Sequence, residues 1–161
     1  MIEKKNQKYL KNEDNLIILK IMNYNNKMLM LSKILEEIDN TKDAIIVTLP
    51  ASVKWEDYVK ELDAARNYTC TLNFKVHNFP KGIKEGDKCY LVHQGFIKGW
   101  MEIVGFSEKS FECKTTGKQW KGKFIERSGP FHYLTDKLPM TGFQGFRYFN
   151  IEEYKNKTTN R

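Results

Sequence analysis

Residues 83–106 read IKEGDKCYLVHQGFIKGWMEIVGF, and the predicted fold depends on this stretch. Turn signals at Gly86-Asp87 and Gln94-Gly95 bound two short segments that are typical of strands. After the second turn, apolar residues recur at every second position, as they do in a strand with one buried face. This alternation places Ile97, Met101 and Ile103 on one face and Lys98, Trp100 and Glu102 on the other. We therefore expect Trp100 on the polar face of this strand.

The sequence on either side of this stretch completes the fold prediction. Upstream, residues 44–49 form a short apolar run that is typical of a strand buried on both faces. A helix is expected after it, with an apolar stripe formed by Trp55, Tyr58, Val59 and Leu62. Downstream, turn signals recur at the short spacing that is typical of a small barrel.

The glycine-centred motifs of residues 83–106 resemble those of the PUA-like superfamily, and within it the ASCH and EVE branches. The resemblance is carried by Gly86-Asp87, by His93-Gln94-Gly95 and by the strand from Ile97 to Gly105. It extends over residues 44–150, where a strand and helix precede these motifs and an aromatic-rich strand follows them. It implies a curved barrel of five or six strands, whose cleft in relatives binds RNA, a modified DNA base or a small ligand.

We therefore expect an α+β domain built on a small, strongly curved PUA-like β-barrel with flanking helices. An N-terminal helix is predicted ahead of it from apolar residues at helical spacing, which are Met28, Leu31, Ile34, Leu35 and Ile38. The expected organisation is a flexible N-terminal arm at 1–26, this helix at 27–43, the barrel domain at 44–154 and a disordered tail at 155–161.

Charge and cysteine content restrict the class of partner. The 161 residues include 27 Lys and Arg and 20 Asp and Glu, for a net charge of +7. Residues 81–161 hold 15 of the basic and 9 of the acidic residues, so the C-terminal half carries most of the excess and an anionic partner is favoured. Three widely spaced cysteines argue against a disulfide framework and a zinc site. We expect a cytoplasmic protein with no metal, no cofactor and no membrane partner.

The interpretation that we favour is a nucleic-acid-binding domain that reads an unpaired or modified base in an aromatic and basic cleft. Trp100 and Trp120 would stack on the base, and Lys98, Lys121, Lys123, Arg127 and Arg147 would hold the phosphates, with His93 and Gln94 at the same cleft. RNA and single-stranded or modified DNA fit this pattern equally. A common cleft lined by Trp100 and Arg147 would be the most informative observation.

Other interpretations of the same residues stay open. A small ASCH-type ribonuclease would use His93, Lys98 or Tyr90 for proton transfer and charge stabilisation. A basic module that docks an acidic protein is a further alternative. Trp100 could instead be covered by a helix, and the lysine-rich strand could be a solvated edge. The sequence does not indicate an oligomeric state.

Overall fold

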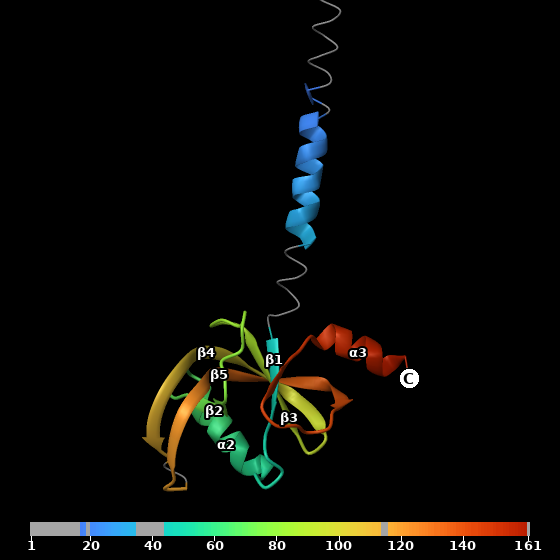
Figure 1. The fold of residues 1–161 in the computed structure, drawn as a ribbon. Coiled ribbons are helices and arrows are strands. Elements are labelled where there is room, and N and C mark those ends of the chain that lie inside the picture. The colour runs from blue at the N-terminus through green and yellow to red at the C-terminus, as the bar shows by residue number, and fades with distance from the viewer. Residues whose placement is uncertain (1–16, 19, 35–43, 114–115, 161) are drawn as a thin grey trace, which may run out of the picture. The chain divides into compact units, whose positions relative to one another are not determined.

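The computed structural model describes residues 17–18, 20–34, 44–113 and 116–160. The chain forms two compact units, Met1–Asn40 and Thr41–Arg161 (Figure 1). Among the described residues, the first unit is a helix, and the second holds a six-stranded sheet and two helices. The second unit therefore belongs to the mixed α and β class that the sequence predicts.

In the first unit, residues 17–18 and 20–34 are helical. The helix thus starts ahead of residue 27 and includes Asn23, Asn25 and Asn26, although these interrupt the apolar pattern. An asparagine destabilises a helix by at most about 0.7 kcal/mol relative to alanine. The neighbouring Leu, Met and Lys residues favour the helix and can offset this cost. Residues 1–16 of the expected arm and 35–43 of the expected helix lie outside the described residues. No helix in the described part of the chain is long and apolar enough to cross a membrane.

The second unit begins with β1, whose first four residues are buried, as expected for a strand covered on both faces. The elements in chain order are β1 (Ala44–Thr48), α2 (Trp55–Ala65), β2 (Leu72–Val76), β3 (Lys88–His93), β4 (Phe96–Glu112), β5 (Gln119–Pro139), β6 (Phe146–Tyr148) and α3 (Ile151–Thr159). Residues 155–159, expected in a disordered tail, belong to α3. Asn150 caps α3 by accepting a hydrogen bond from the Glu153 amide at 3.0 Å.

The strands form one curled sheet in the order β2-β5-β4-β3-β1-β6. β1 is parallel to β3, and all other neighbours are antiparallel. β4 and β5 contain 17 and 21 residues and pair along most of their length. Strands of this length exceed the usual strand length and must bend to stay within a small domain, and the sheet curls into a half-barrel (Figure 1).

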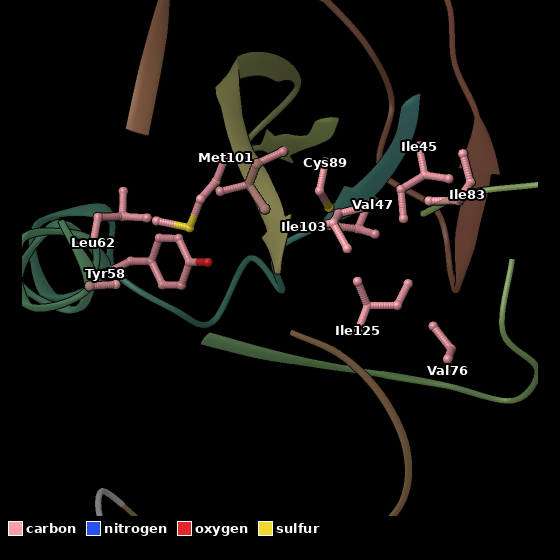
Figure 2. Close-up of a cluster of buried hydrophobic side chains, with 12 residues drawn as sticks. Ile45, Val47, Tyr58, Leu62, Val76, Ile83, Cys89, Met101, Ile103 and Ile125 are labelled. Carbon is pink, nitrogen blue, oxygen red and sulfur yellow. The ribbon is translucent and has the colours of Figure 1, made fainter. Parts of the chain in front are cut away.

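Alternate residues of the strands pack into two cores on opposite faces of the sheet. The α2-side core contains Ile45, Val47 and Leu91 from the strands, together with Tyr58 and Leu62 from α2. Figure 2 shows Tyr58 and Leu62 directed toward Met101 at the edge of this cluster. The α3-side core is formed by strand residues that point to the opposite face, and two residues of α3, Ile151 and Tyr154, pack against it. Its strand residues include Ala44, Ile46, Tyr90, Val92 and Ile97.

A β-bulge near the start of β4 changes which residues face each core. Ile97 pairs with Val92, and Gly99 pairs with Leu91, so Lys98 is an extra residue between them. Ile97 therefore packs in the α3-side core, whereas Met101 and Ile103 pack in the α2-side core. The prediction that these three residues share a face was wrong, because strict alternation does not hold across an extra residue.

Gly99 allows the β4–β5 ladder to pass this bulge. A Cβ atom at this position would lie 2.2 Å from the His132 carbonyl oxygen and 2.7 Å from the Phe131 ring. Backbone cannot retreat from such a contact as a flexible side chain can. Only glycine lets β4 and β5 approach this closely here.

We predict that Gly99→Ala lowers the free energy of unfolding by about 2–4 kcal/mol, because overpacking against backbone strains both strands. Urea denaturation monitored by circular dichroism measures the change. Gly105→Ala, also in β4, is the matched control, since its Cβ would meet a side-chain carboxylate, that of Glu126 at 2.8 Å, rather than backbone. We expect the control to lose less than about 1 kcal/mol. Equal losses in the two variants would contradict the account of Gly99.

Candidate functional site

The N-terminus of α2 carries an aromatic cluster, the Trp55 cluster, which consists of Trp55, His93, Phe131 and Tyr133. Trp55 is the first residue of α2, His93 ends β3, and Phe131 and Tyr133 lie on β5. The His93 ring stacks on Trp55 with centroids 5.6 Å apart. Phe131 and Tyr133 meet Trp55 edge-on at 6.1 and 6.5 Å. Residues separate in sequence thus meet at one end of the sheet, where α2 begins.

Tyr133 presents the most accessible ring of this cluster, with 58% of its surface exposed. Its two ring partners, Phe131 and Trp55, stand at 76° and 82° to it in T-shaped contacts. No ring among the described residues stacks on the face of Tyr133. The tyrosine is therefore held by aromatic neighbours while more than half of its surface stays available to a planar ligand.

A groove of about 290 Å³ adjoins the cluster. Its lining residues come from α2, β4 and β5 and are Trp55, Phe96, Ile97, Lys98, Tyr133, Leu134, Thr135, Asp136 and Lys137. The groove is lined by aromatic and aliphatic side chains together with a few charged groups, as small-ligand sites generally are.

Two lysines give the groove its positive charge. The Lys98 ammonium lies 5.3 Å from the centre of the Trp55 ring, and the Lys137 ammonium lies 4.5 Å from that of Phe96. Cation–π contacts of this kind hold each ammonium beside the groove without neutralising it. The groove's carboxylate, Asp136, lies 3.4 Å from the ammonium of Lys155 in α3. The arrangement therefore favours an anionic ligand that also carries a flat ring.

His93 belongs to the structural support of the cluster. Its side chain is 0% exposed, and its Nε2 lies 2.8 Å from the Val53 carbonyl oxygen, just ahead of α2. Its Nδ1 is buried without a hydrogen-bond partner. With Nε2–H donating to Val53, the ring fixes the loop that leads into α2. The imidazole does not reach a ligand in the groove, contrary to its expected place in a cleft.

The structure places Trp100 away from Lys98, because the bulge at Lys98 separates their faces. Trp100 packs against the α3-side core, and the exposed ring of His132 stacks on it at 3.9 Å and 12°. The Lys88 ammonium lies 4.8 Å from the centre of the same indole. Trp100 thus already has a stacking partner, unlike Tyr133.

Trp100 and Arg147 share a face of the sheet but no cleft. The register places them at the two ends of one cross-strand row, with Tyr90 and Ile46 between them. Three strand spacings separate them by roughly 14 Å. Tyr90 is 3% exposed and packs against Phe149 at 4.9 Å, so the middle of the row is core. The Arg147 guanidinium lies 4.1 Å from the centre of the Phe143 ring.

The remaining predicted residues are dispersed. Trp120 pairs with Phe111 near the far end of the β4–β5 ladder, eleven residues of β4 beyond the row of Trp100. At about 3.3 Å per residue, this is roughly 35 Å of strand, so one base cannot contact both tryptophans. Lys121 lies exposed beside Trp120, and Gln94 is exposed in the β3–β4 turn. Tyr90 is buried on the face opposite His93 and Lys98, so the three catalytic candidates do not form one site.

The prediction that Arg127 holds phosphates together with Lys121 and Lys123 was wrong, because Arg127 is buried. Its side chain is 4% exposed, and one guanidinium nitrogen donates to the Tyr58 hydroxyl at 3.2 Å. Lys123 instead lines a second groove of about 540 Å³ with Lys75, His77 and Glu108.

Burial raises the pKa of the Cys89 thiol, and the nearby Arg127 partly offsets this increase. Cys89 is therefore a neutral core residue.

Sequence reasoning assigned Trp55 only to the apolar stripe of a helix, and it did not single out Tyr133 or Lys137. A signal was present in Phe131 and Tyr133, which lie two residues apart and so share a strand face. Comparison with protein-family models, with curated proteins and with solved structures finds no match to this chain. The function must therefore be argued from the site itself.

We predict that His93→Ala lowers the free energy of unfolding by about 2–4 kcal/mol, because it leaves a cavity beside Trp55 and removes the hydrogen bond to Val53. Urea denaturation measures this loss. The matched control is His77→Ala, since His77 is exposed and should change stability by less than about 0.5 kcal/mol. A fully stable His93→Ala protein would show that the imidazole is not a structural support.

Proposed function

We propose that the second unit binds single-stranded nucleic acid and stacks one unpaired base on Tyr133. The observation that carries this proposal is the exposed side chain of Tyr133, which lies beside a groove lined by Lys98 and Lys137. A flat, apolar platform next to two cations suits a ligand that combines a base with phosphates.

The stacking geometry supports this choice of platform. Trp55 and Phe131 hold Tyr133 through T-shaped contacts, so little side-chain freedom is lost when a base binds. Stacking of a base on an aromatic side chain contributes about 1–3 kcal/mol and tolerates different bases. A groove of about 290 Å³ is at the small end of ligand sites and suits one base rather than a duplex.

The charge distribution supports a phosphate backbone as the second part of the ligand. Asp136 is paired with Lys155, which leaves Lys98 and Lys137 as the groove's unneutralised charges. Residues 81–161 also carry an excess of basic groups, which favours encounter with a polyanion. Phosphate contacts would fix the position of the strand, and stacking would hold the base.

We further propose that the domain is a PUA-like one, as its sequence motifs suggest. The curled six-stranded sheet with flanking helices agrees with the architecture that the resemblance implies. In this proposal the base site is formed by Trp55, Tyr133, Lys98 and Lys137 rather than by Trp100 and Trp120. The ribonuclease alternative receives less support, since His93 and Tyr90 are 0% and 3% exposed.

We predict that the full chain binds a mixed-sequence, fluorescently labelled single-stranded oligonucleotide at low salt. The logarithm of the affinity should fall linearly with the logarithm of salt concentration, because bound lysines displace counterions from the phosphates. Lys98→Ala and Lys137→Ala should each make this line less steep, reducing the magnitude of its slope by about one. Anisotropy titrations at several salt concentrations measure it. Absence of binding at low salt would contradict the proposed function.

We also predict that Tyr133→Ala weakens binding of the same oligonucleotide by about 5- to 150-fold, equivalent to one lost stacking contact. The fold should survive, because Tyr133 is mostly exposed. Trp120→Ala is the matched control, since Trp120 is a partly exposed aromatic residue near the far end of the same ladder. Binding that depends on Trp120 and not on Tyr133 would move the site to that end of the sheet.

A further inference from the structure

The helix of residues 17–18 and 20–34 carries a line of large, exposed apolar side chains. Ile17, Ile21, Tyr24, Met28 and Leu31 are between 49% and 64% exposed. They follow one another at intervals of four, three, four and three residues. We call this line the seam. Its spacing repeats every seven residues, which is the repeat of a two-stranded coiled coil.

The seam forms a single narrow stripe along the helix. At 3.6 residues per turn, its five residues fall within an arc of about 80°. A parallel line begins with Ile18, Met22 and Leu29, but Asn25 and Ser32 interrupt it. Among the described residues, the seam is thus the apolar line with no polar interruption. A strict stripe of this width matches a partner helix better than it matches a broad core.

The residues that flank the seam indicate the identity and direction of that partner. Lys20 and Lys27 lie along one side of the seam, and Asn25 and Ser32 lie along the other. If two copies pair in parallel, each lysine of one helix faces Asn25 or Ser32 of the other. If they pair antiparallel, lysine faces lysine, which costs free energy. The charge pattern therefore accepts a second parallel copy.

We propose that two copies of this chain associate through the seam as a parallel, two-stranded coiled coil. Such an interface needs to bury at least about 1,000 Å² in total. Five half-exposed large side chains from each helix supply surface on that order. This association is independent of the nucleic-acid site, because it uses only residues of the first unit.

The first test measures the mass of the full chain in solution by sedimentation equilibrium. We expect twice the 19.0 kDa of one chain. Met28→Glu should raise the dissociation constant of the dimer at least about a hundredfold, because two carboxylates would meet in an apolar seam. Met30→Glu is the matched control, since Met30 is 66% exposed on the same helix but lies off the seam. It should leave the mass at that of a dimer.

The second test determines the direction of pairing by cysteine crosslinking. Leu31→Cys is introduced into a full chain in which Cys70 and Cys113 are changed to serine, leaving the buried Cys89. In a parallel pair the two new cysteines face each other and should form a disulfide under mild oxidation. In an antiparallel pair they would lie about 20 Å apart, at 1.5 Å per residue along the helix, and no crosslink would form.

Four results would overturn the proposal. One is a monomer at every concentration up to about 100 μM, the range of weak but specific association, which would mean that the seam is covered within the chain or by another protein. Another is a dimer that Met28→Glu and Met30→Glu leave equally intact, which would place the interface elsewhere. A mass above that of a dimer, or a dimer without the Leu31→Cys crosslink, would contradict the parallel two-stranded arrangement.

Discussion

The rest of the second unit depends on the bend of the β4–β5 ladder. Its two strands are long, and their register shifts at three places, between Ile97 and Gly99, Trp100 and Glu102, and Ile103 and Gly105. Each shift adds twist and redirects side chains. The ladder can therefore contribute Ile97 to the α3-side core and Met101 to the α2-side core. Without the bulge at Lys98, the side chains of Ile97, Met101 and Ile103 would share one face of β4.

Buried polar side chains then fix α2 against this ladder and determine where the Trp55 cluster lies. His93 bonds to the carbonyl of Val53 ahead of the helix, and Arg127 bonds to Tyr58 within it. The Ser128 hydroxyl donates to the carbonyl oxygen of Cys70 at 2.6 Å, beyond the end of the helix. Buried polar groups are costly unless bonded, so each of these bonds favours one placement of α2. The position of Trp55 follows from them.

The two proposals, if both hold, have a joint consequence for affinity. A pair of chains joined by the seam would carry two base-binding grooves. When two linked protein sites bind one nucleic-acid strand, the overall affinity rises without any new contact, provided that both sites can bind at the same time. A modest single-site affinity, as expected for one stacked base and two lysines, would then suffice for function.

The sequence by itself determined the mixed fold class, the buried β1 and the apolar stripe of α2, because each depends on a local repeat in the residues. It also contained the charge excess of the C-terminal half. The tertiary structure decided which residues meet at the candidate site. Lys98 and Trp100 are two positions apart, yet the extra residue at the bulge separates them, and Trp55, Lys98 and Tyr133 meet although they are distant in sequence. Similarly, Arg127 lies an even number of residues after Lys121, so strict alternation would place both on one face. Only the packing of Tyr58 over β5 shows that Arg127 is buried. Local periodicity carries no information about bulges or about which helix covers a face, since both arise from contacts between distant segments.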